Sequence, residues 1–156
     1  MLDAVLDSWD RSNRALLNLL GLIPIHGLDV RIKDGSPTFS EIFSHMHHER
    51  MVSNFENAPE YAGQVPAEEW AHERDATRIA ERLEESRKRV RDAVAGRIKA
   101  NRGLDHDFAH PIQLIEFLIF HDGYHHGQIK SALKTAGCPI ADADTGLVIW
   151  DVWRAL

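Results

Sequence analysis

Residues 111–136, PIQLIEFLIFHDGYHHGQIKSALKTA, form the stretch of sequence that decides the fold. Pro111 is a favourable first residue of a helix, and Gly137 and Pro139 predict where that helix ends. Residues 112–120 are apolar on nearly every side of the helix. This pattern predicts that the helix is the most buried one of the chain.

Three more long helices are predicted outside this stretch. Residues 2–20 carry apolar side chains at helical spacing. Thr38-Phe39-Ser40-Glu41 has the form of a capping box and predicts a second helix over residues 38–57. The third helix, over residues 76–101, is heavily charged and has a narrow apolar stripe.

Together with a short final helix over residues 145–154, these elements predict an all-α four-helix bundle. Residues 58–75 form a connection longer than the roughly 2–8 residues usual between bundle helices, so it can cross the bundle. We therefore expect the order up-down-down-up, in a single domain that spans residues 1–156.

The composition argues against several classes of protein. A formal charge of −6 disfavours a nucleic-acid partner. The single cysteine cannot form an internal disulfide, which favours a reducing compartment. Acidic residues near the start disfavour a signal peptide, and no apolar run approaches the roughly 18 residues of a membrane span. We therefore expect a cytoplasmic protein that contacts neither membrane nor nucleic acid.

Histidine placement carries the functional signal. His121 and His125 lie four residues apart, so their side chains point within roughly 40° of each other on one helix. Gln128 continues the same line. Two such imidazoles can share one metal ion, although the glutamate of the zinc-protease motif is absent here. Spacing alone leaves two interpretations open, a metal site and a pair of structural core histidines.

A metal ion needs at least one more ligand from another helix. On the second predicted helix, His45 lies closest to the apolar face. His47 and His48 point further outward but remain alternatives to His45. Glu49 lies at the edge of the same face, where it is a candidate ligand or a partner for an imidazole N–H.

Other residues near these positions have plainer interpretations. His106 and His110 also lie four residues apart, but Pro111 disfavours helical conformation at His110, which we interpret as a cap. His126 is assigned to the surface. Tyr124 is assigned either to the core or to a hydroxyl that faces the site.

Two segments resemble the DinB family of helical-bundle metalloenzymes. They are residues 39–47, FSEIFSHMH, and residues 121–129, HDGYHHGQI, the second of which is similar to the family's HxxxHxGQ signature. The resemblance covers residues 1–156 and implies an up-down-down-up bundle that is often a homodimer. It also implies a metal ion bound by three histidines, carried over here onto His45, His121 and His125.

Some members of that family are thiol transferases that use a low-molecular-weight bacterial thiol such as bacillithiol or mycothiol, and others are maleylpyruvate isomerases. Three histidine ligands leave a coordination position open, which is typical of catalytic sites, and imidazole suits Zn or Ni. The first hypothesis is therefore a metal-dependent S-transferase. A metal-bound thiol would attack a small-molecule substrate, with Glu49 and Gln128 beside the ligands and Tyr124 orienting the substrate.

Three alternatives stay open. The first is a metal-dependent hydrolase with Glu49 as general base. The second is a non-catalytic metal-binding or scaffold protein whose dimer face includes Trp150 and Trp153. The third is a plain bundle in which the histidines are hydrogen-bonded core residues.

Overall fold

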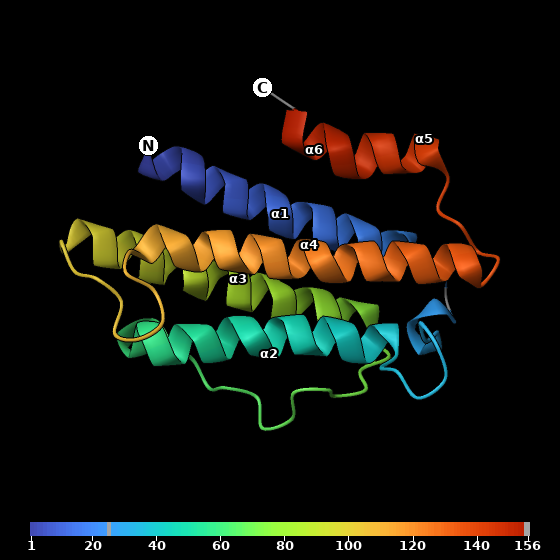
Figure 1. Cartoon of the computed structure of the whole chain (residues 1–156), viewed down its shortest axis with the longest axis horizontal. Coiled ribbons are helices and arrows are strands. Elements are labelled where there is room, and N and C mark those ends of the chain that lie inside the picture. The colour runs from blue at the N-terminus through green and yellow to red at the C-terminus, as the bar shows by residue number, and fades with distance from the viewer. Residues whose placement is uncertain (25, 155–156) are drawn as a thin grey trace.

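The computed structural model describes residues 1–24 and 26–154, and four long helices dominate them (Figure 1). These are α1 (Leu2–Leu22), α2 (Phe39–Asn57), α3 (Ala76–Lys99) and α4 (Pro111–Thr135), with short 3-10 turns at η1 (Gly27–Asp29) and η2 (Pro59–Tyr61). Within the described residues, β-pairing is limited to a single bridge between Arg31 and Thr38. The prediction of an all-α bundle is confirmed.

Capping boxes fix the starts of two of these helices. Thr38 Oγ1 accepts the Glu41 N–H at 3.2 Å, and the Glu41 carboxylate accepts the Thr38 N–H at 2.6 Å. This is the predicted capping box. At the start of α4, His110 Nδ1 accepts the Ile112 N–H at 3.2 Å, and Gln113 Oε1 accepts the His110 N–H at 3.1 Å. The interpretation of His110 as a cap is therefore confirmed.

Helices α2 and α3 run in the same direction because residues 58–75 cross the bundle between them. Thr38 Oγ1, at the start of α2, lies 3.3 Å from His72 Nδ1, just before α3. Asn57, at the end of α2, accepts the backbone N–H of Asp105, just after α3, at 3.0 Å. Figure 1 shows α1 and α4 running the opposite way, so the long helices follow the order up-down-down-up.

The core consists of two apolar clusters with polar residues between them. One cluster gathers residues near the start of α2 and the end of α4, and the other gathers residues near the start of both α1 and α4. Between the members of these clusters, each long helix contributes one buried polar side chain to a polar layer. These side chains are Asn13, Arg50, Ser86 and Asp122.

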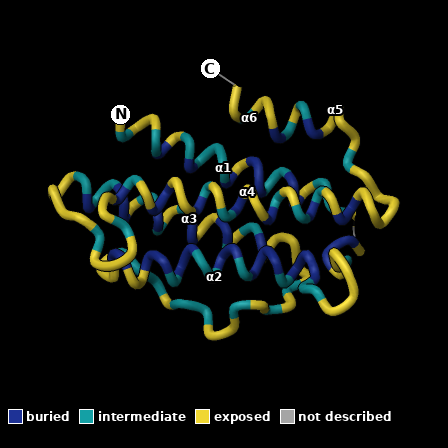
Figure 2. Tube along the Cα trace, in the orientation of Figure 1, coloured by how far each residue is buried: buried dark blue, intermediate teal, exposed yellow. Residues whose placement is uncertain are grey.

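Helix α2, rather than α4, is the most buried of the long helices, and Figure 2 shows dark blue along most of its length. On α4, Phe117 and Phe120 are 37% and 76% exposed, so the prediction for residues 112–120 was wrong. Besides α3 and α4, helix α2 also contacts η1 and η2 in the connections that flank it. A face of α4 stays open to solvent even though its side chains are apolar.

The chain ends in three short elements, α5 (Asp142–Thr145), a π-helical stretch η3 (Gly146–Trp150) and α6 (Asp151–Arg154). We call them together the C-terminal segment, which begins at Asp142 rather than at residue 145. It lies beside α1, where Asn18 Nδ2 donates to the Val148 carbonyl at 2.5 Å. None of the described helices combines the length and apolar character needed to cross a membrane.

Candidate metal centre

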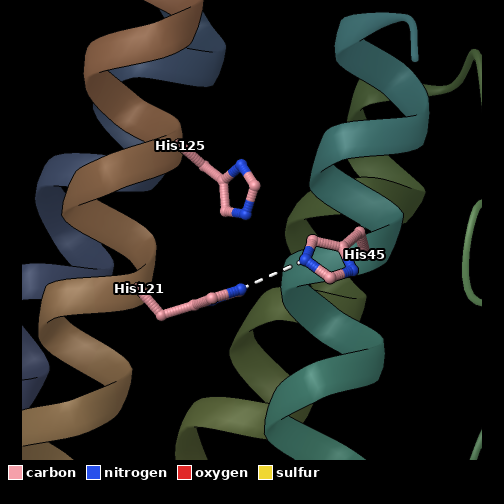
Figure 3. A group of neighbouring side chains, drawn as sticks. All are labelled: His45, His121 and His125. Atoms are coloured by element: carbon pink, nitrogen blue, oxygen red, sulfur yellow. Dashed lines mark hydrogen bonds between the residues drawn. The ribbon is translucent and has the colours of Figure 1, made fainter. Parts of the chain in front are cut away.

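The imidazoles of His45, His121 and His125 converge between α2 and α4 (Figure 3). One ring nitrogen from each lies within 4.8 Å of the other two. His45 Nε2 and His121 Nε2 are 3.1 Å apart. Two nitrogens bound to one tetrahedral zinc ion at the usual bond length are separated by about 3.3 Å. The pair of His45 and His121 therefore has the spacing that a shared ion requires, and His125 lies close enough to complete the group.

The second ring nitrogen of two of these histidines is held by a partner. His45 Nδ1 donates to the Glu69 carboxylate at 2.8 Å, and His125 Nδ1 donates to Gln128 Oε1 at 2.9 Å. A neutral imidazole that donates from Nδ1 carries its lone pair on Nε2. These partners therefore fix the tautomer and turn the Nε2 lone pairs toward the cluster, as metal-binding histidines require.

His121 has a different neighbour. Its Nδ1 is buried, has no hydrogen-bond partner among the described residues, and lies 3.6 Å from Asp122 Oδ1. Asp122 Oδ2 accepts from Arg50 Nη2 at 2.6 Å, and Arg50 is fully buried. Asp122 thus stands between a cationic side chain and a candidate ligand. At 3.6 Å its effect on His121 is electrostatic, because the separation exceeds a hydrogen bond.

The protonation states also fit a metal ion. Burial lowers the pKa of His45, and a positive charge on His121 would lower it further. Burial is also the main cause that lowers the pKa of His125 to about 4, and a positive charge on His121 is the next largest cause. The imidazoles of His45 and His125 are therefore neutral at pH 7, the form that binds metal. His121 Nε2–H can donate to the lone pair of His45 Nε2 at 3.1 Å, and a divalent ion bound by both nitrogens would take the place of that shared proton.

Two contacts of His45 come from residues that the sequence did not single out. Glu69 holds its Nδ1, and Trp70 stacks on its ring with centroids 4.2 Å apart and planes within 5°. Both lie in residues 58–75, the connection that crosses the bundle. Irregular backbone has no period from which a side chain's direction follows. The length of this connection was the only signal that it covers the site.

A cavity of about 280 Å³ opens beside the cluster and gives a small molecule access to His125. Its walls include Ile32, Lys33, Trp70, Tyr124 and Gln128. Tyr124 is 58% exposed and its ring centroid lies 5.1 Å from that of His125. The assignment of Tyr124 to the core was therefore wrong, because it stands on the open face of α4. Its role with a substrate stays a prediction.

The remaining candidates on α2 lie outside the cluster. Glu49 Oε1 accepts from Ser53 Oγ at 3.1 Å, and its charge only partly offsets the lowered pKa of His45. His47, predicted to point outward, is buried, and burial lowers its pKa to about 4. The outward prediction was wrong because α2 also packs against α3. His48 is partly exposed and is not part of the cluster.

The surface assignment of His126 was also wrong. Its side chain is partly buried at a cavity that α1, α4 and the C-terminal segment enclose. Burial lowers its pKa to about 4, and the positive charge of Lys130 adds to the effect. The sequence pattern missed this because the C-terminal segment, which packs on α1, also reaches this side of α4 through the hydrogen bond from Lys130 to Thr145.

Fold and site together define a helical-bundle protein with a candidate three-histidine metal centre between two of its helices. The model of the DinB family matches residues 1–152, and the chain belongs to that family. It matches no curated protein and no solved structure. The resemblance first seen in residues 39–47 and 121–129 is therefore confirmed along nearly the whole chain.

Proposed function

We propose that this protein is a metal-dependent S-transferase that joins a low-molecular-weight thiol to a small electrophilic substrate. His45, His121 and His125 would hold the ion, with zinc or nickel as the expected metals. One observation carries the proposal: three imidazole nitrogens converge beside an open cavity.

When bound, a divalent ion with three neutral ligands would lower the pKa of a coordinated thiol from its ordinary value of about 8.5. The chain's own residues shape and hold this site. Glu69 and Gln128 fix the ring orientations of two ligands. Trp70 and Tyr124 offer apolar faces to a substrate, and Lys33 offers a positive charge to an anionic group on the thiol or the substrate.

The state of the nearby carboxylates supports transfer over hydrolysis. A hydrolase needs a carboxylate placed to accept a proton from water. Glu49, the candidate for that role, accepts a hydrogen bond from Ser53 on its own helix. Glu69 is engaged by His45. A thiol nucleophile fits this arrangement better, since its lower pKa makes it easier to deprotonate than water.

The first test is metal content. The protein is purified without a His tag, and bound metal is measured by mass spectrometry for the wild type, His125→Ala and the control His106→Ala. We expect stoichiometric metal in the wild type and the control, and its loss in His125→Ala. Absence of metal from the wild type after incubation with Zn²⁺ and Ni²⁺ would refute the proposal.

The second test is thiol conjugation to a generic electrophile such as 1-chloro-2,4-dinitrobenzene. In that reaction a sulfur–carbon bond forms, chloride leaves and the thiol proton passes to solvent. We expect turnover with bacillithiol or mycothiol that His125→Ala abolishes and His106→Ala retains. Hydrolysis of ester substrates without thiol would favour the hydrolase instead. Full metal loading without either activity, in a homodimer, would favour the scaffold interpretation.

A further inference from the structure

A second cavity, of about 460 Å³, lies between α1, α4 and the C-terminal segment. Its volume falls within the roughly 300–1,000 Å³ of small-molecule sites. It shares no lining residue with the cavity beside His125. Gly127, which lines it, follows His125 by two residues and so points to the opposite side of α4, at about 200° around the helix. The two cavities are therefore separate sites.

Two glycines one turn apart, Gly123 and Gly127, keep this cavity open. A methyl group at either position would meet no heavy atom within 4 Å. These glycines therefore do not serve close packing between helices. A glycine inside a helix is less stable than alanine, so the space comes with a loss of helix stability.

The C-terminal segment bridges the cavity without filling it. Arg11 Nη1 donates to the Val152 carbonyl at 2.6 Å and anchors the segment on α1. On the other side, Lys130 Nζ of α4 donates to Thr145 Oγ1 at 3.2 Å. Between these anchors Trp150 and Trp153 line the cavity while remaining 54% and 39% exposed. Their indole rings are thus available to a ligand.

The charges around the cavity favour an anion. Lys130 brings an ammonium group to its wall. Asp122 also lines it, but this carboxylate is buried and pairs with Arg50 at 2.6 Å. Ser12 and His126 add hydrogen-bonding groups. An apolar enclosure whose lining carries one cation without an ion-pair partner among the described residues is suited to an apolar molecule that carries one negative group.

We propose that this second cavity binds a planar aromatic molecule with a single carboxylate. The rings of Trp150 and Trp153 would stack on the aromatic part, since offset and edge-to-face contacts between aromatic rings are favourable. Lys130 would bind the carboxylate through a charge-assisted hydrogen bond. The site is independent of the metal centre and of the function proposed for it.

Titration of the full chain with 2-naphthoate tests the proposal, with tryptophan fluorescence and calorimetry as readouts. The neutral analogue 2-naphthamide is the matched ligand. Gly127→Leu fills the cavity. Gly21→Leu, on α1 and outside the lining, is the matched control because a Cβ added there also meets no atom within 4 Å. Ser12→Leu narrows the cavity from the side of α1 and is the second filling variant, used if Gly127→Leu does not fold.

We expect 2-naphthoate to bind one site, and the filling variants to weaken it at least tenfold while Gly21→Leu leaves it unchanged. Lys130→Met should reduce the preference for naphthoate over naphthamide by about tenfold, the ordinary effect of a charged hydrogen bond. His125→Ala should bind naphthoate as the wild type does. No binding at millimolar ligand, loss of binding in His125→Ala, or a dimer that excludes the ligand at high protein concentration would each overturn the proposal.

Discussion

Replacing Asp122 by asparagine should destabilise the protein strongly, because it removes the charge opposite a buried guanidinium. Arg50 is fully buried, and its Nε and Nη2 donate to Asp122 Oδ2 at 3.1 Å and 2.6 Å. Removing one partner of a buried ion pair costs about 3–5 kcal/mol, since the other charge stays in a medium of low polarity. We expect Asp122→Asn to lower the free energy of unfolding by that amount.

The assay is urea unfolding followed by circular dichroism on metal-free protein, so that metal affinity does not enter. Glu85→Gln is the matched control, because its ion pair with Arg89 lies at the surface and contributes about 0–1 kcal/mol. In Arg50→Met/Asp122→Asn neither charge is left unpaired. The double variant should therefore lose less stability than the two single variants summed, by about 2 kcal/mol or more.

The other hydrogen bonds of Arg50 keep the double variant less stable than the wild type. Arg50 Nη1 also donates to Asn13 Oδ1 at 2.8 Å, and methionine leaves that buried oxygen without its donor. If Asp122→Asn cost less than about 1 kcal/mol, as at the surface, the buried pair would not organise the polar layer. If the stability losses of the two single variants simply added up in the double variant, the same conclusion would follow.

Three further predictions concern the histidines. Gln128→Leu should weaken metal binding by roughly 10–100-fold, because His125 loses the acceptor that orients its ring. The control Gln64→Leu, in the crossing connection, should leave metal affinity unchanged. Chelator competition measures both affinities, and equal metal affinities of the two variants would contradict the role of Gln128. Metal should stay bound down to pH 6.5, since burial lowers the pKa of His45 and brings that of His125 to about 4, so that protons do not displace the ion from these two ligands. Dialysis across pH measures release, and release above pH 6.5 would contradict this. Burial lowers the pKa of His47 to about 4 in the fold, whereas an exposed histidine in the unfolded chain has a pKa of about 6.5, so folding favours the neutral form. Stability should therefore decline from pH 6.5 toward 4, and His47→Gln should flatten that decline in urea unfolding.

The long helices could be predicted from sequence because their signals are local. A capping box at Thr38 and a proline at position 111 mark helix starts through hydrogen bonds between near neighbours. The spacing of His121 and His125 likewise follows from helix geometry alone. In each case a few consecutive residues contain all the information that the prediction needs.

Other features could not be predicted, because they depend on which helix lies next to which. His47 is buried since α2 contacts two long helices, whereas a single apolar face was assumed. Glu69 reaches His45 from an irregular connection whose path no pattern gives. Arg50 was assigned no role, because a charged side chain is ordinarily placed at the surface.

The polar layer links the fold to the candidate metal centre through the register of α2 and α4. The ligands on these helices meet only if the two helices keep one axial alignment, and apolar packing alone tolerates sliding more readily than a hydrogen-bonded ion pair does. Arg50 follows His45 by little more than one turn, and Asp122 is the residue after His121. The contact between Arg50 and Asp122 therefore fixes the alignment within one turn of the histidines. Displacement of α4 by one turn, about 5.4 Å, would separate His45 from His121 and break the buried pair at once. For this reason we expect Asp122→Asn to impair metal binding even under conditions in which the bundle remains folded.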